Sequence, residues 1–448
     1  MKDLTKGKPS SLILSFAFPI FLANLLQLTY SLADTRIVGS FLGEDALAAV
    51  GSTSTVSNLI IGFLLGLANG FAIITAQRFG AKDIKGMKKS FAASILLGTG
   101  ISIVLTVLGM IFKNTLLGFL NVPHNLYGEA GAYIFIIIAG MTATFLYDSC
   151  AAVLRSLGDT ITPLIILLVS VALNITGDLF FVVVLKSSVR GAAIATVLAQ
   201  IIAFVICFVY MFKKYEILRL TKSDFTALDC NLVRNMLGSG LSMGFMSSLV
   251  NIGSLTLQTA INKLGQDIIV AHTAARKISE MFMIMFTVFG QTMATYCGQN
   301  MGAGRIDRVK TGIKSALIYT CSWCVLTVIA SYTIGDWLIY LVTGSNNENV
   351  IRNAVNYLKF DTVFYFVTAF ICILRNAMQG LGEHIIPLVS SSLEMVGKII
   401  IAATLVPWLG YAGVIVAEPI VWFIMVIPLI IQILKMIPVL EKQYGSPV

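Results

Sequence analysis

Acidic and amide side chains lie within long apolar runs of this sequence, where a charge is costly. Asp34 lies near the end of the first run, and Asn174 and Asp178 lie in the fifth. Because residues four apart share one face of a helix, the Asn174 amide and the Asp178 carboxyl are expected side by side. An ionisable group at the centre of a bilayer costs roughly 2.5–3.5 kcal/mol on insertion scales, so these residues are candidates for function. Carboxylate and amide oxygens suit a hard cation or a shuttled proton.

The composition indicates what kind of protein positions these residues. Of 448 residues, 57% are hydrophobic and 12% are charged, whereas globular proteins average about 45–50% apolar and about 25% charged. A soluble protein could not bury so much apolar surface. Runs such as 134–146 and 201–212 are long and unbroken, which excludes a barrel of short alternating strands. The formal charge of +9 fits the basic bias of cytoplasmic loops, so no nucleic-acid partner is expected.

Charge clusters, Gly-Pro punctuation and polar gaps divide the chain into twelve apolar spans, each long enough to cross a bilayer. The predicted fold is an all-α integral membrane protein with twelve transmembrane helices. Most of the 31 basic residues fall on the side of the N-terminus in alternate connections. Both termini are therefore predicted in the cytoplasm of a multi-pass protein of the cell membrane. The predicted spans are 11–33, 50–77, 90–112, 129–154, 161–185, 190–213, 240–262, 276–299, 313–342, 356–379, 385–407 and 411–436.

The two halves of the chain repeat each other. A shift of 222 residues places Leu42-Gly43-Glu44-Asp45 on Leu264-Gly265-Gln266-Asp267, and a shift of 224 places Leu157-Gly158-Asp159 on Leu381-Gly382-Glu383. We therefore predict two pseudo-symmetric six-helix lobes, 1–215 and 239–448, joined by a polar cytoplasmic linker at 216–238. Parallel repeats of this kind build transporters whose two halves rock about a central site.

Several motifs, in this order and duplicated, resemble those of the multidrug and toxic compound extrusion (MATE) family. They include Asp34-Thr-Arg-Ile-Val-Gly39, Thr75-Ala-Gln-Arg-Phe-Gly-Ala81 and Gly298-Gln-Asn-Met-Gly-Ala-Gly304. The resemblance implies a secondary antiporter: drugs or other amphiphilic organic compounds, often cationic, leave the cell as H⁺ or Na⁺ enters. It implies no ATP motor and no cofactor besides the coupling ion. Consistently, the sequence has no phosphate-binding GxxxxGK[ST] motif.

The chain is most similar to the DinF-like branch of that family. This branch has a cation site that is formed by an Asp on the first helix, an Asn and an Asp one turn apart on the fifth, and a Thr on the sixth. The matching residues are Asp34, Asn174, Asp178 and Thr196. The resemblance therefore implies that these four residues bind the coupling ion, whether H⁺ or Na⁺.

The internal repeat supplies a control on this assignment. At a shift of 222, Asp34 falls on Thr256, and at a shift of 224, Asp178 falls on Ala402. The acidic set is absent from the second half, so the symmetry of the scaffold does not require it. The alternative is a hydrogen-bonded Asp that fixes a helix kink, which Pro19 and Gly177 make plausible.

Candidates in the second half are less well supported. Asp361 is a candidate second cation site, because another branch of the family uses an acid on that helix. That branch also has a Glu on the seventh helix, and span 240–262 contains no acid. Glu394 and Lys398, one turn apart, are expected to neutralise each other. Asp148 and Glu418 fit cavity lining and structural hydrogen bonding equally.

Soft and aromatic side chains form a candidate substrate cavity in the eighth span. Met281, Met285 and Phe282 could adapt to varied cations through methionine flexibility and cation–π contact. Interhelical or lipid-facing packing is the alternative, and it explains most such clusters. The chain is expected to act as a monomer whose partners are small organic molecules and membrane lipid.

The sequence agrees less well with two other function classes, a flippase and an enzyme. A lipid-precursor flippase of the same superfamily would share the two-lobe plan and would need a more cationic central cavity, but Lys398 is the only basic residue in the middle of a predicted span. An enzyme is not expected, because the three histidines are far apart and no HExxH motif occurs.

Overall fold

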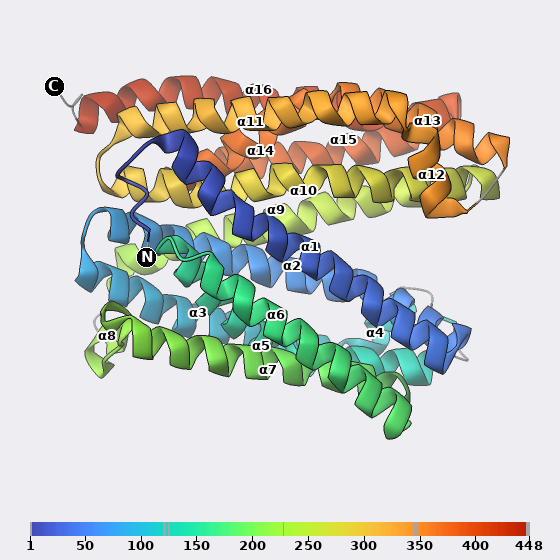
Figure 1. Cartoon of the computed structure of the whole chain (residues 1–448), viewed down its shortest axis with the longest axis horizontal. Coiled ribbons are helices and arrows are strands. Elements are labelled where there is room, and N and C mark those ends of the chain that lie inside the picture. Colours follow the sequence, from blue (N-terminus) through green and yellow to red (C-terminus); the bar gives the residue numbers. More distant parts are fainter. Residues whose placement is uncertain (1, 120–121, 124–125, 227, 345–346, 445–448) are drawn as a thin grey trace. The chain divides into compact units, whose positions relative to one another are not determined.

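The computed structural model describes residues 2–119, 122–123, 126–226, 228–344 and 347–444, and these residues are almost entirely helical (Figure 1). The helices of the first half are α1 (Pro9–Leu42), α2 (Glu44–Gly80), α3 (Ile84–Ile111), α4 (Lys113–Phe119), α5 (Tyr127–Ser156), α6 (Ile161–Asp178), the π-helical η2 (Leu179–Val184), α7 (Ser188–Lys214), η3 (Glu216–Leu218) and α8 (Lys222–Thr226). Those of the second half are α9 (Cys230–Ile261), α10 (Gln266–Gly302), α11 (Ile306–Thr333), α12 (Gly335–Thr343), α13 (Glu348–Val363), α14 (Tyr365–Gly380), α15 (Ile385–Leu409) and α16 (Tyr411–Tyr444).

The predicted all-α, twelve-helix architecture is confirmed. By length and hydropathy alone, 10 helices among the described residues could cross a membrane, and the bent pair α13–α14 would make 11. The 37-residue α10 adds one more long helix. The predicted ninth span, 313–342, is wrong at its end, because α11 stops at Thr333. The predicted tenth span is broken at Phe364, where the axis bends by 52°.

The chain divides into two compact units. Residues 1–3 and 18–247 form the first unit, and residues 4–17 and 248–448 form the second. Helix α9 begins at Cys230, within the segment predicted as a linker, and passes through the division after Ser247. The lobe boundaries drawn from the sequence stay a prediction.

In the first unit, α5 packs against α2 and α7, and α2 crosses α9 at paired glycines. A Cβ at Gly66 would lie 2.5 Å from the carbonyl oxygen of Met243, and one at Gly70 would lie 2.5 Å from that of Ser239. Small residues four apart allow two membrane helices to approach at backbone distance. The Ser239 hydroxyl adds a bond of 2.8 Å to the Gly70 carbonyl oxygen.

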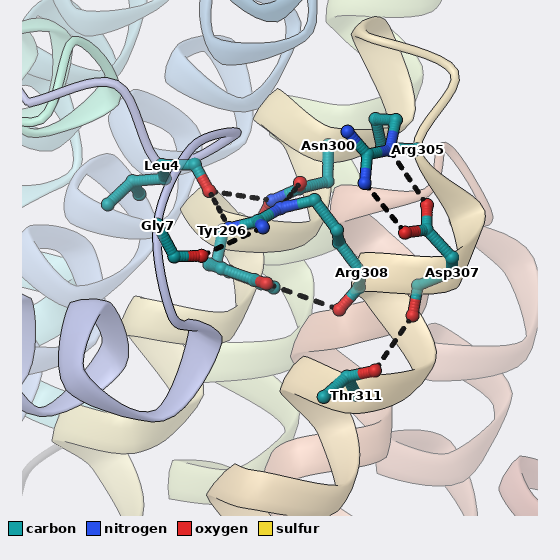
Figure 2. Close-up of polar contacts among 8 residues, drawn as sticks. All are labelled: Leu4, Gly7, Tyr296, Asn300, Arg305, Asp307, Arg308 and Thr311. Atoms are coloured by element: carbon teal, nitrogen blue, oxygen red, sulfur yellow. Dashed lines mark hydrogen bonds and ion pairs between the residues drawn. The ribbon is translucent and has the colours of Figure 1, made fainter. Parts of the chain in front are cut away.

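In the second unit, α10 packs against α13 and α14, and α15 packs against α16. The segment before α1 is held by the turn between α10 and α11 (Figure 2). Arg308 donates from Nη1 to the Gly7 carbonyl oxygen at 2.9 Å and from Nη2 to that of Leu4 at 3.1 Å. Asn300 donates to the same Leu4 oxygen at 3.3 Å. Buried backbone carbonyls need such donors, so Arg308 fixes the entry into α1.

Matching turns in the two units support the internal repeat. Gly43 and Gly265 precede α2 and α10 with φ of 88° and 100°, a region that glycine adopts without strain. The second repeated motif, Leu-Gly followed by an acid, caps a helix in each half. Asp159 accepts from the backbone N–H of Thr162 at 3.0 Å, and Glu383 accepts from that of Ile385 at 2.9 Å. The sequence motifs that repeat in the two halves therefore form the same turns and helix caps.

Candidate functional site

A polar network connects α6 and α7 in the first unit. Asn174 and Asp178 lie one turn apart on α6, as predicted, and are 3% and 0% exposed. With its amide oriented by the surrounding hydrogen bonds, Asn174 donates to Asp178 Oδ2 at 3.0 Å. Its oxygen accepts from the backbone N–H and the hydroxyl of Thr196, both at 3.2 Å. One amide therefore joins the acid on α6 to the hydroxyl on α7.

Helix α1 supplies the second acid and a tyrosine. The carboxyl group of Asp34 interacts with that of Asp178. The hydroxyl of Tyr30, one turn before Asp34, lies 3.4 Å from Thr196 Oγ1. Since the Thr196 proton points to Asn174, Tyr30 is the donor in this pair. The structure brings all four predicted residues together and adds Tyr30.

Local packing explains why the three helices meet here. A Cβ at Gly177 would lie 3.0 Å from that of Ala195, so a glycine lets α6 approach α7 beside the network. Val38, one turn after Asp34, is buried in a small apolar cluster with Val182 and Ala192. The π-helical turn η2 begins directly after Asp178. Such turns are rare and occur frequently at functional sites.

The network has unused acceptor capacity. One oxygen of Asp34 and one of Asp178, both Oδ1, are buried and have no hydrogen-bond partner within the described part of the chain. A buried polar atom without a partner is costly. Two carboxyl groups in contact cannot both be ionised without a large repulsion. The arrangement can therefore hold a proton between the acids, or a cation beside the two Oδ1 atoms.

The donor set is oxygen-rich and poor in soft ligands. Among the described residues, no group of three or more His, Cys, Asp or Glu side chains could hold a metal ion. The site therefore suits a proton or a hard monovalent ion better than a transition metal.

The sequence analysis did not identify Tyr30, although its spacing of four residues from Asp34 places both on one face of α1. It also missed Tyr133 on α5, which packs against the Val38 cluster.

Asp361 lies in a second buried polar cluster, in the second unit. It is 0% exposed, and Ser279 donates to its Oδ2 at 3.4 Å. Its Oδ1 is buried without a partner among the described residues. Tyr365 and Tyr357, both 0–1% exposed, belong to the same region of α13 and α14. The predicted candidate is thus a buried acid with one free acceptor.

Two buried ion pairs surround this region. Arg276 donates to Glu418 at 2.9 Å, and Lys398 donates to Glu394 at 3.0 Å and lies 3.5 Å from Glu418. The predicted pairing of Glu394 with Lys398 is present, and Glu418 joins it. The predicted eighth span, 276–299, starts too late, because α10 begins at Gln266 and Arg276 lies inside it. Neutralisation by Glu418 allows this charge inside a helix.

Two of the three candidate cavity residues, Met281 and Met285, lie on a different face of α10 from the one that contacts Asp361. At 100° per residue, Met281 and Met285 lie on the face of α10 opposite Ser279. Met281 is 53% exposed. Phe282 packs against the apolar cluster that contains Tyr357 and Leu358, and its carbonyl oxygen accepts from Trp323 at 2.9 Å. A role of these side chains in substrate binding stays a prediction.

The MatE family model matches the chain twice, over residues 19–180 and 242–404. These segments make up well over half of the chain, and the double match agrees with the internal repeat. The probable multidrug resistance protein YpnP of Bacillus subtilis is 28% identical over 417 residues, with 92% of each chain covered. The probable multidrug resistance protein YoeA of the same organism is 28% identical over 350 residues, covering 76% of this chain and 71% of YoeA.

Solved structures share the whole fold. A MATE crystal structure in complex with MaL6 superposes with a TM-score of 0.91 at 22% identity and covers 98% of this chain and 99% of that one. A fold match of this extent, with the repeated family match and the twelve long helices, leads to one assignment. This chain is a multi-pass membrane protein that belongs to the MatE family of transporters.

Proposed function

We propose that the protein is a cation-coupled antiporter that exports drugs or other amphiphilic organic compounds across the cell membrane by alternating access. The observation that carries this proposal is the buried Asp178, which Asn174 holds at 3.0 Å, together with the buried Oδ1 atoms of Asp34 and Asp178, which have no partner among the described residues. Both acids lie within apolar helices of one unit. The substrate class follows from the relatives, since YpnP and YoeA are both described as probable multidrug resistance proteins.

The coupling ion binds at Asp34, Asn174, Asp178 and Thr196. One proton shared by the two carboxyl groups would relieve their repulsion, which supports H⁺ as the coupling ion. Na⁺ would displace that proton and use the two free Oδ1 atoms. Loss of the ion leaves two like charges in contact, and their repulsion separates α1 from α6. Ion binding and helix position are therefore coupled at this site.

The energy available is sufficient for export. A cation that crosses the full membrane potential gains about 2.3 kcal/mol per 100 mV. This free energy supports a concentration ratio of about fiftyfold for a neutral substrate. From the distribution of basic residues we also propose that both termini lie in the cytoplasm.

Asp361 is proposed as a second cation-binding group. Arg276 is paired with Glu418 and Lys398 with Glu394, whereas Asp361 has no ion-pair partner among the residues that the structure describes. A proton or Na⁺ would neutralise this acid. The absence of an acid in span 240–262 makes this site secondary to the Asp34–Asp178 pair.

Drug efflux in everted membrane vesicles tests the proposal. H⁺ and Na⁺ gradients are imposed separately on the parent protein, on Asp178→Asn and on Asp45→Asn. Asp45 is an exposed acid in the first turn of α2, so it is the matched control. We expect Asp45→Asn to behave as the parent and Asp178→Asn to lose gradient-driven efflux. Equal uphill efflux by the parent and Asp178→Asn under both gradients would refute the assigned role.

A further inference from the structure

A groove opens on the second unit along α11 and α16, and none of its lining residues belongs to a buried acid cluster. Its volume is about 580 Å³, within the range of about 300–1,000 Å³ that is typical of small-molecule sites. Buried Ile313, Leu374 and Ile433 form its floor, and Ile318 and Leu434, which are 55% and 68% exposed, form its rims. Helices α11 and α16 run alongside each other here (Figure 1). The groove is almost wholly apolar.

Charged side chains occur at one end of the groove only. Lys310, Lys314 and Glu441 line it near the start of α11 and the end of α16. Lys310 donates to Glu441 at 2.9 Å, so these two charges neutralise each other. Lys314, one turn further along α11, has no ion-pair or hydrogen-bond partner among the residues that the structure describes. The groove therefore ends in one uncompensated positive charge.

The length of the groove matches one leaflet of a bilayer. From Lys310 to Cys321, both of which line it, α11 advances about 16 Å at 1.5 Å per residue. Half of the hydrocarbon core of a bilayer is about 15 Å. A molecule with its charge at Lys314 would thus extend its apolar part from the membrane surface to the bilayer centre.

We propose that this groove binds an anionic phospholipid, with an acyl chain along α11 and α16 and the phosphate on Lys314. A phosphate offers strong acceptors to an ammonium group. A basic residue at the membrane surface attracts anionic lipid with about 1 kcal/mol of free energy. A zwitterionic lipid fills the same apolar groove but brings its own positive charge next to Lys314. The charge at the end of the groove selects the lipid class.

Two cysteines of the chain can report whether the groove is occupied. Cys321 lines the groove and is partly exposed, whereas Cys230, at the start of α9, is exposed elsewhere. The delipidated protein in detergent is treated with a maleimide, and labelling is followed residue by residue by mass spectrometry. The additions are dioleoyl phosphatidylglycerol, dioleoyl phosphatidylcholine, or inorganic phosphate. Cys230 reports any general change in reactivity within the same sample.

We expect phosphatidylglycerol to slow labelling of Cys321 at least about fivefold relative to phosphatidylcholine, which corresponds to a mostly occupied site. Inorganic phosphate should leave the rate unchanged. Lys314→Gln should abolish the difference between the two lipids, and Lys314→Arg should keep it. Lys442→Gln is the matched control, because Lys442 is exposed at the same end of α16 but does not line the groove.

Three results would overturn the proposal. Equal protection by both lipids would show that the groove only accepts apolar chains. Protection by inorganic phosphate alone would show that the acyl chain plays no part. A Lys314→Gln variant that is as selective as the parent would show that the phosphate does not contact Lys314. The readout needs no transport, so its failure is separate from a failure of the proposed export function.

Discussion

The amide nitrogen of Asn174 lies 3.0 Å from Oδ2 of Asp178, while the amide oxygen accepts from Thr196. This relationship orients the carboxyl group, because the side chain that holds it is itself fixed from α7. The remaining Oδ1 of Asp178 is left free in a buried position. The acid is therefore pre-organised to bind an ion while its other oxygen stays fixed.

Replacing Asn174 by Leu should uncouple the network. The substitution removes the donor to Asp178 and the acceptor of Thr196, so the acid loses its fixed orientation. Removing such a partner of an ion ligand typically costs at least about tenfold in affinity, and we expect a loss of this size in gradient-driven efflux. Thr176→Val is the control, because Thr176 bonds only within α6, to the Ala172 carbonyl oxygen. Equal losses in both variants would contradict the assigned geometry.

The main features of this site were predictable from the sequence. The spacing of Asn174 and Asp178 fixes one helical face, and the family resemblance adds Asp34 and Thr196. The π-helical turn after Asp178 was not predictable, because it depends on a shift in backbone hydrogen bonding that no residue pattern encodes. Tyr133 was missed because its contact with the Val38 cluster comes from tertiary packing.

The fold was predictable in its helix count and less so in its helix ends. The prediction ends spans at charged residues, which places Arg276 at the start of the predicted eighth span. The structure keeps Arg276 inside α10, since Glu418 on α16 neutralises it. The partner lies 142 residues away, so no local pattern shows the pairing. The bend at Phe364 was likewise not predictable, because no proline or glycine lies beside it in the sequence.

Glu418 should be the most sensitive acid for stability. It accepts from Arg276 and lies close to Lys398, so Glu418→Gln leaves buried positive charge uncompensated. Breaking a buried pair costs about 3–5 kcal/mol, which equilibrium unfolding in detergent would measure. The double variant Glu418→Leu with Arg276→Leu should recover part of this loss, because Lys398 keeps Glu394. Glu216→Gln, which removes an exposed pair with Arg219, should change little. A Glu418→Gln variant as stable as the parent would contradict the buried-pair account.

The helix crossing of α2 and α9 gives a steric prediction. At Gly66 a new Cβ would lie 2.5 Å from the backbone oxygen of Met243, so Gly66→Ala must push the helices apart. We expect a loss of about 1–3 kcal/mol in unfolding free energy. Gly51→Ala, on the same helix with no atom within 4 Å, should instead gain up to about 1 kcal/mol. Similar effects at both positions would argue against the close crossing.

Asp159 should make stability depend on acid pH. Burial opposes its charge, but hydrogen bonds from Tyr215 at 2.6 Å and from Thr162 outweigh this and lower the pKa of Asp159. In the unfolded chain the pKa of Asp is about 3.9, so the stabilisation is complete above that pH and is lost as pH falls through the lower folded value.

We therefore expect Asp159→Ala to lower the free energy of unfolding by about 1–2 kcal/mol at neutral pH, as for a lost helix cap. This loss should become smaller below about pH 4. Unfolding midpoints measured from pH 3 to 7 provide the comparison, with Asp45→Ala as the control. A cost of Asp159→Ala that stays constant over this range would show that the charged form is not the one stabilised.

The central claim is that Asp34 and Asp178 couple ion binding to substrate movement. The most direct test separates exchange from accumulation in proteoliposomes that contain the parent protein, Asp34→Asn or Asp178→Asn. Substrate exchange at equal concentrations needs only binding and alternating access, whereas accumulation against a gradient needs coupling. Our account predicts that both variants exchange substrate but reach no accumulation under an imposed H⁺ or Na⁺ gradient. Accumulation by Asp178→Asn equal to that of the parent would contradict it.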